Sequence, residues 1–245
     1  MKYESSLGIV LRSADYKEYD RMLTVFTQDY GKVSAIARSS RKQGGALLAS
    51  SQVFSCSEFS FYVSKGRTSV TSGTIKNTFF NLRKDVPALS AAAVICDVCE
   101  KTVMEDEPNR RMFSLLASSL FCLDNGKSPA SVFVFFVFKA LDILGLRPWL
   151  KSCVRCQSPV AFDKINILLG GAVCENCPGE HVNPKYISII NDIFKVPSKN
   201  MSDNLVHVDK SLFSLSRRFL TANIEYEPKA MDMFYDLLNN SGAFK

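Results

Sequence analysis

Two Cys-x-x-Cys pairs constrain the fold of this chain more than any other feature. Cys153 and Cys156 form the first pair, Cys174 and Cys177 form the second, and 17 residues lie between them. This spacing is typical of a zinc ribbon. Each pair places two thiolates on one side of a metal, so two pairs complete a tetrahedron of sulfur ligands at about 2.3 Å. We predict one structural Zn²⁺ per chain, because four sulfurs leave no open position for water.

Other interpretations of these cysteines are two disulfides or an accidental spacing. Disulfides are rare in a reducing cytoplasm, and Gly170 and Gly171 before the second pair favour the tight turns of a metal site. His181 follows Cys177 by four residues and is an alternative ligand, although four cysteines already suffice. The other cysteines are expected to be small buried hydrophobes: Cys56, Cys96, Cys99 and Cys122.

The apolar segments predict neither secretion nor a membrane span. The N-terminus has no apolar core of signal-peptide length, so we expect a cytoplasmic protein. The strongest apolar run, 132–138, is interrupted by Lys139 and Asp142 and falls short of the roughly 20 residues that a bilayer requires. It predicts a buried core helix instead.

Short strand-like segments fill the first 77 residues. They lie at 5–13, 21–28, 32–38, 52–63 and 68–77, and the turn between the second and third contains Gly31, which is free to adopt positive φ. In the fourth segment Phe59 and Phe61 alternate with Glu58 and Tyr62. Five strands in about 75 residues, with a basic bias, predict a closed barrel of the OB type.

Helical patterns follow the barrel on both sides of the cysteine pairs. Several begin with a capping residue and proline, as at Ser128 and Pro129 or Asn183 and Pro184. The last is expected to open at Pro228. Between the cysteine pairs, a short apolar strand is expected at 165–173. We predict an α+β fold divided into an OB-fold nucleic-acid-binding domain, a helical domain in two parts, and a zinc ribbon inserted between those parts. The predicted bounds, in chain order, are 1–80, 81–150, 151–180 and 181–245.

Positive charge gathers in the first third of the chain. Residues 1–80 hold 11 Lys and Arg against 6 Asp and Glu, whereas the rest of the chain is close to balanced. Such a bias suits a polyanion, because each neutralised phosphate releases a counterion; a solvated face without a partner remains the alternative. The candidate DNA-binding residues are Lys32, Arg38, Arg41, Lys42, Lys65 and Arg67.

The loop 38–45 concentrates three of these cations on a Ser- and Gly-rich backbone that we expect to be flexible. Single-strand binders also use aromatic platforms on which bases stack. Most phenylalanines of a small barrel fill its interior. Surface aromatics are therefore expected at Tyr16, Tyr19 and Tyr30.

The residues indicate no catalytic motif. Gly126-Lys127-Ser128 lacks the first glycine of a phosphate loop, and the carboxylates 105–107 precede Pro108 as a helix start does. Two functions of other classes remain open. A zinc-ribbon nuclease requires carboxylates around a divalent ion, and a protein-interaction adaptor predicts no DNA binding at low salt.

Two segments resemble the RecO family of repair proteins. The first is 8–38, where the matching positions include Tyr16, Glu18, Asp20, Gly31 and Lys32. The second is 141–156, in which Gly-Leu-x-Pro precedes the first cysteine pair, together with the Gly-Gly before the second pair. Relatives often carry Arg-Arg-Pro-Lys-Ser after the third strand, whereas this chain lacks the proline there.

The resemblance implies a non-enzymatic mediator of recombinational DNA repair. It implies binding of single- and double-stranded DNA and annealing of complementary strands. It further implies cooperation with RecR in loading RecA onto DNA coated by the single-strand binding protein SSB. The implied location is the bacterial cytoplasm, at the nucleoid.

Overall fold

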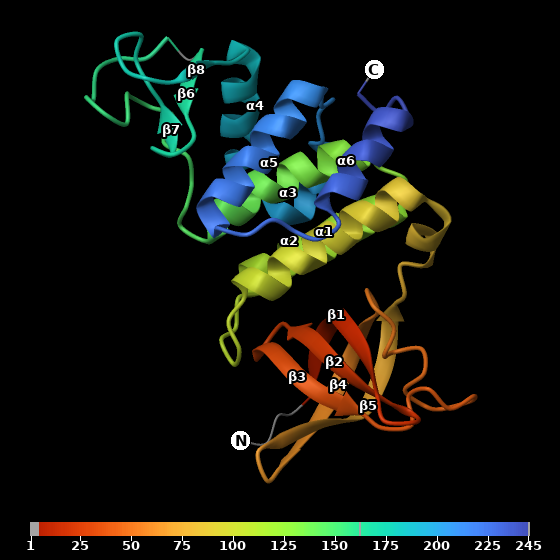
Figure 1. Cartoon of the computed structure of the whole chain (residues 1–245). Helices are drawn as coiled ribbons and strands as arrows, with labels where there is room; N and C mark the ends of the chain where they lie inside the picture. Colours follow the sequence, from red (N-terminus) through yellow and green to blue (C-terminus); the bar gives the residue numbers. More distant parts are fainter. Residues whose placement is uncertain (1–4, 162, 245) are drawn as a thin grey trace. The chain divides into compact units, whose positions relative to one another are not determined.

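The computed structural model describes residues 5–161 and 163–244. The chain forms two compact units, residues 1–125 and residues 126–245. The first holds a closed barrel and two α-helices, and the second holds further helices and a small sheet (Figure 1). The predicted α+β class, with an OB-like barrel followed by helices, is confirmed. The four-part division of the chain stays a prediction.

Five strands close the barrel in the order β1-β2-β3-β5-β4, with β4 returning to β1. They are β1 (Ser6–Tyr16), β2 (Asp20–Thr27), β3 (Gly31–Ala37), β4 (Cys56–Ser64) and β5 (Arg67–Asn77). All pairs are antiparallel except β3 with β5, where Ile36 pairs with Ser69 and Ala37 with Val70. This short parallel pair closes the barrel, as in the OB fold.

Alternating side chains fill the barrel as predicted. Phe59 and Phe61 point into a core with Val10, Leu23 and Val25, whereas Glu58 and Tyr62 are exposed. The expected strand at 52–63 starts four residues late, at Cys56. Its first residues form a turn instead, in which Phe54 adopts a φ of 73° and its N–H donates to Val10 O at 2.9 Å.

Two helices complete the first unit. The helix α1 (Val86–Thr102) follows a short 3₁₀ turn, η1 (Phe80–Lys84), and α2 (Arg110–Asp124) comes next. The Asp85 carboxylate accepts the N–H of Ala88 and so caps α1, while Asn109 caps α2. Phe26 of β2 meets Phe113 of α2 edge to face, with ring centroids 5.5 Å apart. The barrel and the helices therefore share apolar packing.

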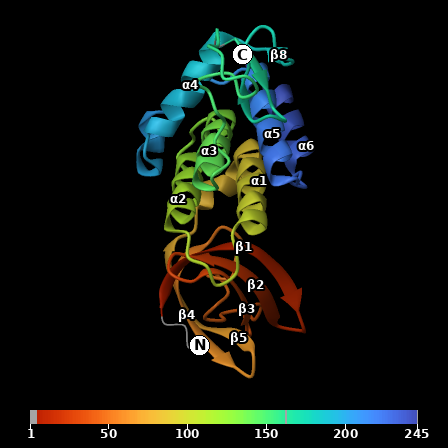
Figure 2. The ribbon, with the colours of Figure 1, turned by 90° about the vertical axis from the view of Figure 1, so that its left-hand side faces the viewer.

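The connection between α1 and α2, residues 103–109, returns to the barrel edge (Figure 2). Glu105 forms a parallel bridge with Lys32 of β3. The N–H of Lys32 donates to Met104 O at 3.2 Å, and the N–H of Asp106 donates to Lys32 O at 3.3 Å. We call residues 103–109 the α1–α2 connection. It pairs with the part of β3 that β5 does not reach.

The second unit is built around α3 (Pro129–Ile143), whose side chains are buried from Ala130 to Leu141. Against it pack α4 (Pro184–Lys195), the 3₁₀ turn η2 (Ser198–Asp203) and α5 (Lys210–Ile224). The buried core helix predicted from the run 132–138 is confirmed. In the described part of the chain, no helix combines the length and apolarity needed to span a bilayer.

The last helix, α6 (Met231–Asn240), begins three residues later than predicted. Pro228 does not open it, because its carbonyl accepts the N–H of Met231 in a preceding turn at 3.0 Å. The rings of Phe133, Phe213 and Phe234 pack together and join α6 to α3 and α5.

A three-stranded sheet lies between α3 and α4 in the sequence. Its strands are β6 (Lys164–Asn166), β7 (Gly171–Ala172) and β8 (Glu180–His181), in the order β7-β6-β8. The single apolar strand expected at 165–173 is therefore wrong. The segment is a hairpin, because Gly170 adopts a φ of 76° and its N–H donates to Ile167 O at 3.1 Å.

Candidate nucleic-acid and metal sites

The two cysteine pairs meet beside the small sheet. The sulfurs of Cys153, Cys156, Cys174 and Cys177 all lie within 4.8 Å of one another. All four are free thiols rather than disulfides. Cys156 Sγ lies 3.5 Å from Cys174 Sγ and 3.8 Å from Cys177 Sγ. A tetrahedron with metal–sulfur bonds of about 2.3 Å has edges of about 3.8 Å, so the cluster has metal-binding dimensions.

The surroundings of the sulfurs shift the pKa values of Cys153 and Cys177 in opposite directions. Burial acts to raise the pKa of the Cys153 thiol. Backbone hydrogen bonds, of which the one with Cys174 has the largest effect, outweigh burial and lower the pKa to about 6. Burial and the neighbouring sulfurs raise the pKa of Cys177 to about 12. Thiolates this close repel one another, so a dication is needed before all four ionise together.

His181, the alternative ligand, lies outside this group. Its ring instead faces two carboxylates, with Nδ1 3.7 Å from Asp163 and Nε2 4.0 Å from Glu175. The cysteines predicted to be core residues, Cys56, Cys96, Cys99 and Cys122, are all buried. Burial raises the pKa of Cys56 to about 11. These four thiols are packing residues and contribute nothing to the cluster.

The six candidate DNA-binding cations lie in three different settings. Lys32 is partly buried, and its Nζ donates to the carbonyl of Glu100 near the end of α1 at 2.7 Å. The favourable interaction of a cation with the C-terminal end of a helix explains this contact. Lys32 therefore joins the barrel to α1.

Arg41 and Lys42 are held against the turn between β1 and β2. Arg41 forms an ion pair of 3.2 Å with Asp15 and donates to Glu18 O at 3.2 Å. Lys42 Nζ lies 5.2 Å from the centre of the Tyr19 ring, which is 44% exposed. Arg41 and Lys42 of the loop 38–45 therefore contact the β1–β2 hairpin, and the flexibility expected of this loop stays a prediction.

Arg38, Lys65 and Arg67 converge on one groove of about 580 Å³. Arg38 follows β3, Lys65 lies in the β4–β5 turn with a φ of 52°, and Arg67 begins β5. Tyr62 of β4 lines the same groove and is 54% exposed. We call these four residues the β4–β5 surface. The described residues that line the groove include no acidic side chain.

Tyr62 is the residue that sequence reasoning missed. The strict alternation along β4 places it opposite the buried Phe61, so the signal was present in the pattern. Among the predicted surface tyrosines, Tyr19 is exposed, Tyr16 is half-buried and Tyr30 packs against the barrel core. Tyr30 is therefore not a free platform for bases.

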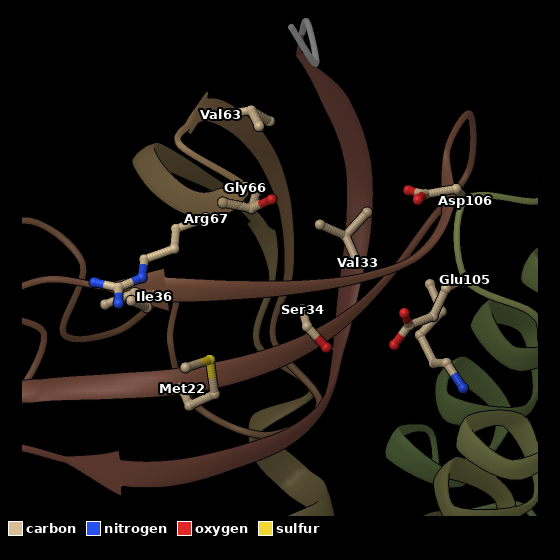
Figure 3. Close-up of a pocket in the computed structure, with 11 residues that line it drawn as sticks. Met22, Val33, Ser34, Ile36, Val63, Gly66, Arg67, Glu105 and Asp106 are labelled. Atoms are coloured by element: carbon tan, nitrogen blue, oxygen red, sulfur yellow. The ribbon is translucent and has the colours of Figure 1, made fainter. Parts of the chain in front are cut away.

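A second groove, of about 440 Å³, also lies on the barrel, and Figure 3 shows residues that line it. Met22 of β2 and Ser34 and Ile36 of β3 line it, and Arg67 belongs to both grooves. Glu105 and Asp106 of the α1–α2 connection also line it. Oligonucleotides bind the face of β2 and β3 and the β4–β5 turn in OB folds, so the groove occupies the expected position.

The fold and the sites define a class: an α+β protein with an OB-like barrel that presents cations and an aromatic ring, followed by helices and a four-cysteine cluster. Residues 1–79 match the family model described as recombination protein O N terminal. Residues 83–226 match the model described as recombination protein O C terminal. The chain belongs to the RecO family.

Several relatives agree with this assignment. The DNA repair protein RecO of Acetivibrio thermocellus is 32% identical over 180 residues, which cover 72% of this chain and 71% of the relative. That of Caldicellulosiruptor saccharolyticus is 28% identical over 246 residues, covering 96% and 98%. That of Listeria monocytogenes is 25% identical over 240 residues, covering 95% and 88%.

Proposed function

We propose that this protein is a DNA-repair mediator that binds single- and double-stranded DNA through its barrel and catalyses no covalent step. The β4–β5 surface carries the proposal. Three cations from separate elements meet an exposed tyrosine around one groove, which is the combination that single-strand binders use. Membership of the RecO family supports the repair role.

The proposed binding mode is electrostatic along the backbone and aromatic at the bases. Arg38, Lys65 and Arg67 neutralise phosphates, while the ring of Tyr62 stacks on a base. Lys42 and Tyr19, 5.2 Å apart, form a second pair of the same kind beside the β1–β2 turn. Lys32 and Arg41 already have contacts within the protein, so we assign them a supporting part.

The test compares two charge-matched triple variants. Labelled single-stranded DNA is titrated at two ionic strengths with wild-type protein, with Arg38, Lys65 and Arg67 replaced by Ala, and with Lys185, Lys195 and Lys199 replaced by Ala. We expect the first variant to bind weakly. Its slope of log affinity against log salt concentration should be shallower than that of the wild type by about 2. Absent or salt-insensitive binding by the wild type would overturn the proposal.

We also propose that annealing of complementary strands, and cooperation with RecR in loading RecA onto SSB-coated DNA at the nucleoid, belong to this protein. The family resemblance supports these activities. A strand-annealing assay with SSB-coated oligonucleotides tests them, with the barrel triple variant as the matched loss-of-binding control. A nuclease assay with Mg²⁺ or Mn²⁺ tests the absence of catalysis, and cleavage of the DNA would contradict it.

For the cysteine cluster we propose one structural Zn²⁺ per chain. The fit between the sulfur separations and a tetrahedral shell supports zinc, and the four ligands would hold it with no position left for water. Cys153 and Cys156 would supply one side and Cys174 and Cys177 the other. Metal analysis of the purified protein tests the proposal, and less than about half an equivalent would contradict it.

A further inference from the structure

The groove in Figure 3 carries opposite charges at its two ends. Ile36 of β3 pairs with Ser69, close to Arg67, and Lys32 of the same strand pairs with Glu105. Lys32 and Ile36 are four residue steps apart along the extended strand, which corresponds to about 13 Å. A guanidinium therefore marks one end, and the carboxylates of Glu105 and Asp106 mark the other. Lys32 also lines the groove at the carboxylate end, where its Nζ donates to the carbonyl of Glu100.

The surface between the two ends is partly apolar. Met22 and Ile36 project into the groove from neighbouring strands, and Ser34 adds a hydroxyl between them. The volume of about 440 Å³ lies within the range of sites for small ligands. An occupant of this groove should be anionic at one end, flat and apolar in the middle, and rich in N–H donors at the other end.

A nucleotide with an amino-substituted base has this arrangement of groups. Its phosphate meets Arg67, its ring lies over Met22 and Ile36, and its exocyclic amine donates to the carboxylates. Carboxylates read cytosine in this way, through its N4 amine, whereas thymine presents a carbonyl at the same place. Thymine would place that carbonyl oxygen against Glu105, where two acceptors repel each other.

We infer that the groove between Arg67 and the Glu105–Asp106 pair is a base-reading subsite, which prefers amino-bearing bases, cytosine in particular, over thymine in single-stranded DNA. This inference rests on the proposed DNA binding and adds selectivity to it. The β4–β5 surface holds the strand without regard to sequence. The carboxylates of the α1–α2 connection then discriminate between the bases.

The experiment measures a ratio of affinities. Fluorescence anisotropy with labelled oligo-dC and oligo-dT of equal length, at pH 8, gives the ratio of the two dissociation constants. We expect the wild type to prefer oligo-dC by at least about fivefold. In the double variant Glu105→Gln with Asp106→Asn, the ratio should fall to near one. Asparagine tolerates the φ of 57° at position 106, so the connection should keep its conformation.

Glu107→Gln is the matched control. It removes a charge from the same connection but lies outside the residues that line the groove. This variant should keep the wild-type ratio, even if both affinities rise through weaker repulsion. A fall in the ratio equal to that of the double variant would overturn the inference, because charge alone would then explain it.

Two further outcomes separate this inference from the proposed function. If the wild type binds neither oligonucleotide, the DNA-binding function itself fails. If it binds both equally, or if the double variant keeps the wild-type preference, DNA binding stands and the base-reading subsite is overturned.

Discussion

Lys139 Nζ donates a hydrogen bond of 2.8 Å to the carbonyl oxygen of Phe194 and a longer one, 3.3 Å, to that of Ile193. The lysine lies on α3, and the two carbonyls belong to the last turn of α4. Only 7% of Lys139 is exposed. A helix leaves most of its last carbonyls without internal partners. Here Ile193 O accepts the N–H of Val196, and the cation from the neighbouring helix supplies a donor to Phe194 O.

We expect Lys139→Met to destabilise the second unit by about 1–3 kcal/mol, because the carbonyl of the buried Phe194 loses this donor. Urea unfolding followed by far-UV circular dichroism measures the change. Lys195→Met is the control, since Lys195 is exposed and pairs only with Asp192 among its described contacts; it should cost less than about 0.5 kcal/mol. Equal stability of Lys139→Met and the wild type would mean that desolvation of the amine cancels its hydrogen bonds.

Gly31→Ala should destabilise the first unit more than an ordinary glycine replacement does. Gly31 has a φ of 69°, and a Cβ there would collide with the backbone of Glu107. Gly66→Ala shares the positive φ, at 72°, but a Cβ there meets open space. We expect about 1 kcal/mol for Gly66→Ala and at least twice that for Gly31→Ala. Hydrogen exchange of the β3 amides measures the loss of stability in each variant. Equal losses in the two variants would argue against the close approach of Gly31 to the backbone of Glu107.

Removal of the proposed Zn²⁺ should loosen the segment around the cysteine cluster. The only tryptophan, Trp149, pairs with Gly171 near the second cysteine pair, so its fluorescence reports on this region. We expect chelation or Cys174→Ser to shift that fluorescence and to lower the midpoint of urea unfolding, because metal binding and folding are coupled. Cys122→Ser is the control, since Cys122 is buried elsewhere. A chelated protein with an unchanged midpoint would contradict a structural role.

Tyr62→Ala should weaken binding of single-stranded DNA by about 1–3 kcal/mol, because a stacking platform is lost. The salt dependence should stay at its wild-type value, since no charge has changed. Tyr62→Phe keeps the ring and should bind like the wild type. Anisotropy titrations of the three proteins at two ionic strengths provide the measurement. A loss of equal size in Tyr62→Phe would mean that the hydroxyl, rather than the ring, makes the contact.

Local chemistry explains which parts of the fold the sequence predicted. The caps at Ser128 and Asn183 act on residues two or three positions away, so their helices begin where the pattern indicates. Alternation in β4 likewise depends only on neighbouring residues. The hairpin within 165–173 was missed because a short apolar run has the same composition whether or not a glycine turns its backbone.

Long-range contacts explain most of the rest. The DNA contact predicted for Lys32 stays a prediction, but no sequence pattern indicates that its Nζ donates to a carbonyl 68 residues further along the chain. No spacing rule connects Lys32 with Glu100, or Glu105 with the groove beside Arg67. The cysteine cluster was predictable because the two halves of each pair are close in sequence and metal chemistry restricts how the pairs meet.

The pairing of β3 also determines the order in which parts of the first unit can assemble during translation. The strand gains its second neighbour only when Ser69 and Val70 have left the ribosome, and the edge around Lys32 waits for Glu105. A fragment that ends at residue 80 would close the barrel but leave that edge bare. Bare strand edges pair with other chains, so an isolated barrel should associate with itself more readily than the intact protein does.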